Sequence, residues 1–248
     1  MQLFIVSPDE VVVRDDCLVL TNDRVCGQLT RVLRAKSWYA CVIQTIQESE
    51  VVRREITVEM ITAWSLQARI WSIYRKRLTD ITSVAFLIAL PNKWDKLELI
   101  LQKLTEVRVS EIILCPTERS QLTSIPQQKR QRRQIILLEA AEQAWRWDLP
   151  RIRFIKKLWD LEITYSVTVF DLPTRETSSN GSLIHADAHM LNWDSDHVIC
   201  GVVGPEWWLT VWDYAALPWP YCIVWLGDSV LRTETAAIIG AWKLVNNQ

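Results

Sequence analysis

Two segments near the carboxyl end combine residue types that suit ligand binding. They are GVVGPEWWLT (201–210) and WLGDSVLRTETA (225–236), and each begins as an apolar run typical of a buried strand comes to an end. Gly204-Pro205-Glu206 is a turn sequence, because glycine accepts a positive φ and proline fixes its own φ. Loops of this kind offer backbone N–H and C=O groups to a flat polar ligand such as an adenine ring. Two ordinary turns between strand and helix are the alternative.

Three clusters of basic residues are candidates for contacting nucleic acid. They lie at Arg31, Arg34 and Lys36, at Arg69, Arg75, Lys76 and Arg77, and at Lys129, Arg130, Arg132 and Arg133. In a chain of formal net charge −1, such clusters can form a phosphate-contacting face although the whole protein is not basic. A solvated surface is the alternative for each cluster taken alone.

Histidine and cysteine residues give only weak signs of a metal site. His185 and His189, in HADAHMLNWDSDH (185–197), have the i, i+4 spacing of metal ligands on a helix, but the stretch has the composition of a loop. The six cysteines form no CxxC pair. We therefore expect no metal, and buried thiols in a reducing compartment.

The elements that must position these residues change in character along the chain. Residues 1–72 hold short β-branched runs separated by Pro, Asp, Asn and Ser, the pattern of a small β-barrel, and SIYRKRLTD (72–80) is predicted to be a linker. Apolar runs at 84–90, 111–116, 167–173, 197–206 and 221–227 then alternate with helical patterns at 96–107, 129–145 and 233–245. This alternation predicts an α/β domain with a parallel sheet, which binds ligands at the carboxyl ends of its strands.

Composition narrows the class of protein. The 248 residues are 49% hydrophobic and 23% charged, as in a soluble globular protein, and the balance of 28 Lys+Arg against 29 Asp+Glu excludes a wholly basic nucleic-acid coat protein. The first ten residues do not resemble a signal peptide, and no apolar run is long enough to span a membrane. We expect a cytoplasmic protein.

Four segments, in order, resemble one family. They are ALPNKWDKLELILQKLTEVRVSEIILCPTERS (89–120), EAAEQAWRWDLPRI (139–152), VVGPEWWLT (202–210) and LGDSVLRTETA (226–236), and QLTRVLRAK (28–36) adds a weaker match. Together they resemble the bacterial 16S rRNA (uracil-N3)-methyltransferases of the SPOUT class. The resemblance implies a PUA-like β-barrel RNA-binding domain over 1–72 and an α/β methyltransferase domain over 73–248 with a C-terminal trefoil knot. It also implies S-adenosyl-L-methionine as cofactor, the 16S rRNA of the small ribosomal subunit as partner, and a homodimer.

The resemblance also suggests a role for individual residues. It assigns cofactor binding to Val203, Gly204, Pro205, Glu206, Leu226, Gly227, Val230, Leu231 and Thr235, and RNA binding to Arg31, Arg34, Lys36, Glu118, Arg119 and Arg146. Arg232 is the candidate for stabilising negative charge on a uracil whose N3 loses its proton, and Glu234 for orienting Arg232 or accepting that proton. Glu139, Glu142 and Gln143 are expected on a helix edge that faces the site. Ordinary ion pairs and helix-terminal charges are the alternatives for these residues.

Tryptophan stands where the family has glycine. Glycine accounts for 6 residues, where a usage of about 7% would give roughly 17, and tryptophan for 14. The coincidences with family glycines are at Trp38, Trp94, Trp145, Trp207, Trp208 and Trp219, and Arg108 replaces another. Either the chain is as written and cofactor binding is in doubt, or the gene reads UGA as glycine and was translated with tryptophan.

Two alternatives to the methyltransferase therefore stay open. The first is a non-catalytic RNA-binding relative that has lost its cofactor loop. The second is a knotted methyltransferase that acts on tRNA.

Overall fold

The computed structural model describes residues 1–47, 50–78, 84–162, 164–171, 182–184, 198–218 and 220–246. It divides into two compact units, which are described separately. The first consists of Met1–Ile81 together with Ala141–Asp148, and the second of Thr82–Ala140 and Leu149–Gln248. No helix in the described ranges is long and apolar enough to cross a membrane.

The first unit is built on a six-stranded sheet. Its strands are β1 (Gln2–Val6), β2 (Val11–Arg14), β3 (Cys17–Thr21), β4 (Ala40–Gln47), β5 (Glu50–Ile61) and β6 (Ser65–Arg77), in the spatial order β1-β4-β5-β6-β3-β2. β1 pairs with β4 in parallel, and all other pairs are antiparallel. The strand-rich start of the chain is confirmed, whereas the linker predicted over 72–80 is wrong through Arg77, because β6 pairs with β5 as far as that residue.

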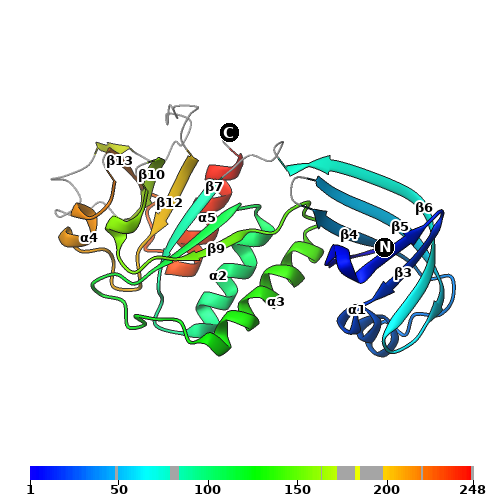
Figure 1. Ribbon diagram of the computed structural model, residues 1–248. Helices are drawn as coiled ribbons and strands as arrows, with labels where there is room; N and C mark the ends of the chain where they lie inside the picture. The colour runs from blue at the N-terminus through cyan, green and yellow to red at the C-terminus, as the bar shows by residue number, and fades with distance from the viewer. Residues whose placement is uncertain are drawn as a thin grey trace. The chain divides into compact units, whose positions relative to one another are not determined.

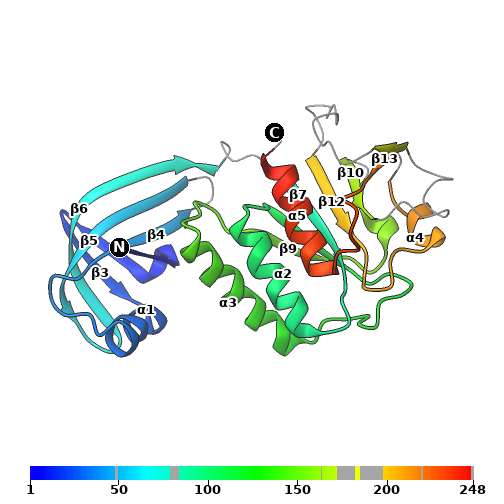
Figure 2. The same ribbon diagram turned by 180° about the vertical axis from the view of Figure 1, so that it is seen from behind.

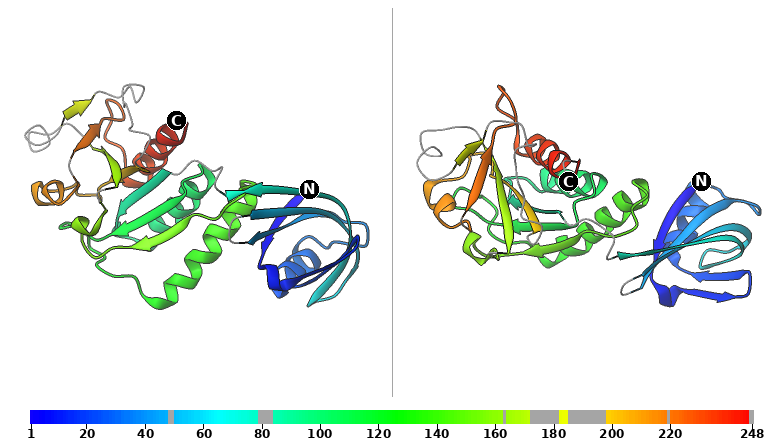
Figure 3. Two further views of the ribbon diagram at one scale, coloured as in Figure 1. Left: turned by 45° about the horizontal axis from the view of Figure 1, so that its top comes forward. Right: turned by 90° about the horizontal axis from the view of Figure 1, so that it is seen from above.

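A short helical segment fills the concave side of this sheet. α1 (Asp23–Gly27) begins at Asn22, whose side chain accepts a hydrogen bond from the Val25 backbone N–H, and it continues into the helical turn η2 (Gln28–Val32). Val25, Cys26 and Leu29 are buried among strand residues in one hydrophobic core. Figure 3 shows the strands curving around α1.

The segment Ala141–Asp148 completes the first unit although it is distant in sequence. Glu142 accepts a hydrogen bond from the Ile5 backbone N–H at 2.7 Å and forms an ion pair with Arg24 at 2.8 Å. Arg53 is buried, donates to the Trp145 and Arg146 carbonyls at 2.8 Å each, and lies 3.6 Å from the centre of the Trp147 ring. These contacts need β1, α1, β5 and the later segment together.

The second unit is a seven-stranded sheet with helices on both faces. Its strands are β7 (Val84–Ala89), β8 (Glu111–Cys115), β9 (Arg151–Phe154), β10 (Tyr165–Phe170), β11 (Ser182–Ile184), β12 (Val198–Val203) and β13 (Tyr221–Val224). All are parallel, in the order β11-β13-β10-β12-β7-β8-β9 (Figure 1). The predicted parallel sheet is confirmed, although β9 and β11 were not expected.

The helices cover the sheet unequally. α2 (Trp94–Glu106), α3 (Gln127–Gln143) and α5 (Thr233–Asn246) contribute to one core, while α4 (Val211–Ala215) and the turn η4 (Leu158–Asp160) contribute to the other. Every residue of β7 is buried, with Phe86 in the first core and Leu87 in the second, as alternation along a strand requires. Figure 2 shows α5 lying alongside β7 and β12.

Candidate functional site

A cavity opens at the carboxyl ends of the central strands of the second unit. Its volume is about 270 Å³, and it is lined by Lys96, Phe170, Asp171, Val203, Gly204, Pro205, Glu206, Trp208, Trp225, Leu226, Ser229, Val230, Leu231, Arg232, Thr233 and Ala236. β10, β12 and β13 are neighbours in the sheet, so the loops that follow them meet at one edge. The two segments singled out in the sequence, 201–210 and 225–236, therefore both line one cavity.

Most of the expected cofactor residues lie in this lining. Val203, Gly204, Pro205, Glu206, Leu226, Val230 and Leu231 are there, whereas Gly227 and Thr235 are not. Gly227 has a φ of 123°, so its conformation is one that favours glycine. Apolar side chains and loop backbone make up much of the surface, as a site for a flat ring would need.

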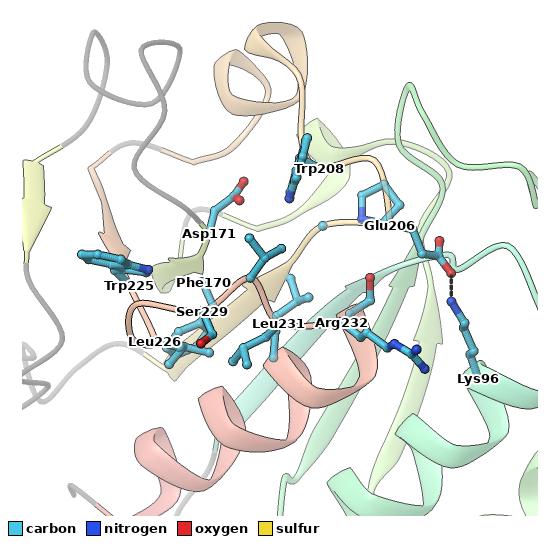
Figure 4. Close-up of a pocket in the computed structure, with 16 residues that line it drawn as sticks. Lys96, Phe170, Asp171, Glu206, Trp208, Trp225, Leu226, Ser229, Leu231 and Arg232 are labelled. Carbon is cyan, nitrogen blue, oxygen red and sulfur yellow. Dashed lines mark hydrogen bonds and ion pairs between the residues drawn. The ribbon is translucent and has the colours of Figure 1, made fainter.

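The charged groups lie at opposite ends of the cavity. Figure 4 shows Asp171 at one end, and Glu206, Lys96 and Arg232 at the other. The Tyr214 hydroxyl donates to Asp171 Oδ2 at 2.7 Å, and burial, reinforced by the nearby Asp171 charge, raises the pKa of Tyr214. Tyr214 therefore stays protonated and holds the carboxylate of Asp171 in place.

The two candidate catalytic residues differ in their exposure. Arg232 lines the cavity, is exposed, and its backbone carbonyl accepts from Ala236 N at 2.9 Å in the first turn of α5. Glu234 is half-buried and does not line the cavity, and among the described residues its Oε2 is a buried oxygen with no hydrogen-bond partner. No ion pair joins Arg232 to Glu234 in the described part of the chain.

The loop Gly204–Trp208 is tied to two other segments. Glu206 pairs with Lys96 Nζ at 2.8 Å, and Arg119 Nη1 donates to the Trp207 carbonyl at 2.7 Å. Glu118 accepts from Thr210 Oγ1 at 2.6 Å, and its backbone N–H donates to Asp213 at 3.2 Å. Glu118 and Arg119, expected to bind RNA, therefore both contact the region of the cavity loop and α4.

Other expected RNA contacts lie in the first unit. Arg31, Arg34 and Lys36 are exposed, and Arg34 has a positive φ of 48°. The side chain of Arg146, in contrast, is only 1% exposed and pairs with Asp148, so this guanidinium is not presented to a partner on the surface. Of the helix edge expected to face the site, Glu142 is instead buried against Arg24.

Several residues of the cavity were not expected from the sequence. Lys96 comes from α2, and Asp171 from the end of β10, far along the chain from both loops. The position of Asp171 directly after a buried parallel strand was the available signal. Lys96 gave no signal, because its place depends on how α2 packs.

No metal site is found in the part of the chain that the structure describes. There, no group of three or more His, Cys, Asp or Glu side chains is placed to hold an ion. His185, His189, His197 and Trp219 lie outside the described residues.

Comparison with known protein families gives a match over most of the second unit. Residues 80–244 match the model of a family described as RNA methyltransferase domain. No curated protein matches the chain.

Solved structures share the fold over nearly the whole chain. A probable rRNA-methyltransferase from Porphyromonas gingivalis is 21% identical with a TM-score of 0.74, covering 100% of this chain and 98% of that one. Ribosomal RNA small subunit methyltransferase E from Neisseria gonorrhoeae, bound to S-adenosyl methionine, is 20% identical with a TM-score of 0.71, covering 97% and 95%. The putative methyltransferase Lpg2936 from Legionella pneumophila, in complex with bound SAM, is 18% identical with a TM-score of 0.72, covering 99% and 98%.

Proposed function

Since the chain belongs to the RNA methyltransferase domain family, we propose that it methylates N3 of a uridine in 16S ribosomal RNA with S-adenosyl-L-methionine as methyl donor. The observation that carries this proposal is the single cavity formed by segments 201–210 and 225–236. Two structural neighbours that contain this cofactor support the choice of donor. The proposal includes a trefoil knot in the second unit, a PUA-like first unit, a homodimer and a cytoplasmic location.

The residues present fit such a cofactor. Val203, Leu226 and Leu231 offer apolar surface to an adenine ring, while the loop backbone around Gly204 offers hydrogen-bonding groups. Asp171, at the end away from Arg232, suits a positively charged group. The cavity volume of about 270 Å³ is slightly below the roughly 300–1,000 Å³ of typical ligand sites, so the cofactor would fill the cavity.

Methylation of N3 requires the protein to align the base with the methyl donor and to stabilise the negative charge that develops on the base. When bound, the cofactor supplies a methyl group on a sulfonium, which N3 of uracil accepts as that nitrogen loses its proton. Holding N3 in line with this methyl group lowers the barrier by several kcal/mol. Arg232 stabilises the negative charge that develops on O2 or O4 of the base, because its exposed guanidinium stands at the edge of the cavity. Glu234 does not line the cavity and is not paired with Arg232 among the described residues, so its side chain would have to rotate in order to orient Arg232 or to take the proton.

The test combines binding with product analysis. Calorimetry measures S-adenosylmethionine binding, and labelled methyl transfer is assayed on unmodified 16S rRNA, naked or in assembled subunits. The expected product is N3-methyluridine, which blocks base pairing and stops a reverse transcriptase at the modified site. Methyl transfer to another atom, or to tRNA alone, would contradict the proposal. Arg232→Lys should lower kcat by about 100-fold with cofactor affinity retained.

One observation favours the non-catalytic alternative. The Trp208 side chain lines the cavity, at a position where the resemblance described above implies glycine, so its indole makes the cavity smaller than glycine would. A chain that binds RNA but not the cofactor in the same calorimetric experiment would support this alternative.

A further inference from the structure

Two cations from different segments hold the loop Gly204–Trp208. Lys96, on α2, forms an ion pair with Glu206 at 2.8 Å, and Arg119, after β8, donates to the Trp207 carbonyl at 2.7 Å. The side chains of Lys96 and Glu206 are 26% and 17% exposed, so water screens this pair less than a fully exposed one.

The carboxylate of Glu206 is occupied by these contacts. Besides Lys96, the backbone N–H of Asn92 donates to both of its oxygens, at 3.2 and 3.3 Å. Glu206 was expected to bind the cofactor, but its hydrogen bonds face α2 and the segment before it. Its side chain therefore fixes where the loop backbone lies.

We propose that Lys96 and Arg119 are positioning residues, which hold the loop Gly204–Trp208 in the conformation that binds the methyl donor. This inference depends on the proposed function, and it gives Arg119 a role other than the RNA contact expected from the sequence. Because the loop would bind through main-chain groups, a displacement of about 1 Å is enough to misalign a reacting group.

The experiment compares Lys96→Met and Arg119→Met with the conservative variants Lys96→Arg and Arg119→Lys. We expect each methionine variant to weaken S-adenosylmethionine binding about tenfold, the effect of lowering the population of the binding-competent loop conformation to about a tenth. Backbone hydrogen exchange should become faster over 204–210, while affinity for a 16S rRNA fragment stays within about twofold of wild type. The conservative variants should restore cofactor binding. Lys103→Met is the matched control, because Lys103 pairs with Glu106 on the same helix and not with the loop.

Hydrogen exchange separates failure of this inference from failure of the proposed function. If the wild-type chain binds no cofactor, faster exchange over 204–210 in the methionine variants still supports the positioning role. Unchanged exchange in both variants overturns it. A loss of RNA affinity by Arg119→Met without a change in the loop overturns it for Arg119.

A separate observation concerns the backbone of three tryptophans. Trp38, Trp145 and Trp208 have φ values of 75°, 52° and 61°. A bulky residue in this left-handed region is a conformational outlier. In the described ranges only three other non-glycine residues have a positive φ. Tryptophan therefore supplies half of these outliers while supplying just 14 of the 248 residues.

At two of these positions the local hydrogen bonds identify motifs that favour glycine. Trp38 is the third residue of a turn closed by Tyr39 N donating to Lys36 O at 3.2 Å, where positive φ calls for glycine or asparagine. Trp145 follows the end of α3, where Arg146 N donates to Ala141 O at 3.0 Å and Trp145 N to Glu142 O at 3.4 Å. This pair of bonds is a Schellman motif with Trp145 at its left-handed position, which is usually glycine.

The indole side chains gain little burial in return. The exposed fractions are 81% for Trp38, 38% for Trp145 and 45% for Trp208, and no tryptophan in the described part of the chain is buried. Tryptophan is normally among the most buried residues on average. Trp147 packs more closely, because the centre of its ring lies 3.6 Å from the Arg53 guanidinium, against 5.8 Å for the ring of Trp145.

We infer that Trp38, Trp145 and Trp208 stand at positions that this backbone reserves for glycine, and that the source cell makes the protein with glycine there from UGA codons. UGA at all three positions, with glycine masses in peptides of the protein purified from that cell, would support the inference. A UGG codon or a tryptophan mass at any of them overturns it there.

Variants of the protein made with tryptophan at these positions, as in the printed sequence, give an independent test. Trp38→Gly, Trp145→Gly and Trp208→Gly should each keep or raise Tm, by up to about 3 °C, because relief of the left-handed strain offsets the added freedom of the unfolded chain. Trp147→Gly, the matched control, should lower Tm. Equal loss of stability in all four variants would contradict the inference.

Discussion

Replacing Gly201 with alanine should destabilise the second unit strongly. Gly201 lies in β12 opposite Phe86 in β7. A Cβ on Gly201 would lie 2.4 and 2.6 Å from two ring atoms of Phe86 and 2.9 Å from Leu244 Cδ1. Carbon atoms in good contact are about 3.5–4.0 Å apart, so the ring would have to move by about 1 Å.

The surroundings allow little movement. Phe86 is fully buried and stacks on Phe170 with ring centres 5.9 Å apart, while Leu244 of α5 closes the same space. Overpacking of a core costs typically 1–3 kcal/mol, and a backbone fixed by strand pairing places this case near the upper end, at about 3 kcal/mol. In a chain of this length, that corresponds to a fall in Tm of about 6–12 °C.

Urea unfolding and calorimetry would measure this loss. Gly27→Ala is the matched control, because a Cβ on Gly27 meets nothing within 4 Å and its φ is −64°, so that change should be neutral or stabilise by up to about 1 kcal/mol. Combining Gly201→Ala with Phe86→Leu should cost less than the sum of the two single changes. A Gly201→Ala chain within about 0.5 kcal/mol of wild type would refute the packing argument.

Two other consequences of burial can be tested. Burial raises the pKa of the Cys41, Cys115 and Cys200 thiols from 9.0 to about 12. Above pH 9 the unfolded chain therefore loses protons that the folded chain keeps, and each thiol lowers the free energy of unfolding by up to about 1.4 kcal/mol per pH unit as the pH approaches 12. Urea midpoints from pH 8 to 11 would measure this fall, and a flat profile would contradict it. Glu142→Gln should destabilise the first unit by about 2–3 kcal/mol, because it removes the negative charge that pairs with Arg24, and Glu142 is the buried partner of this pair. Equilibrium unfolding should give Arg24→Met a similar loss of stability, since either change breaks the same pair.

The sheet of the second unit could be predicted from the sequence because its central strands are apolar on both faces. β7 is buried throughout, and the pattern over 84–90 predicted it directly. The end of β6 was missed because none of its residues after Ile70 is buried and basic residues dominate it. A polar stretch without a buried face gives no periodic signal that distinguishes a strand from a linker.

The candidate site was predictable only where it follows strands. Both loops were found because turn residues come after buried runs, and the sheet order then brings them together. The burial of Arg146 could not be inferred, because its partner Asp148 and the surrounding strands are set by tertiary packing. The placement of Lys96 beside Glu206 depends in the same way on a contact across 110 residues.

The membership of Ala141–Asp148 in the first unit sets the order in which that unit can be completed during synthesis. All six strands of the first unit have been synthesised once the chain reaches residue 77. Arg24 and Arg53 can contact Glu142 and Trp147 only after about sixty further residues have been made. A nascent chain stopped at residue 81 would lack the Glu142 carboxylate that pairs with Arg24 and the Trp145 and Arg146 carbonyls that accept from Arg53. Chains arrested beyond residue 148 and outside the exit tunnel should be the first to resist protease throughout the amino-terminal strands.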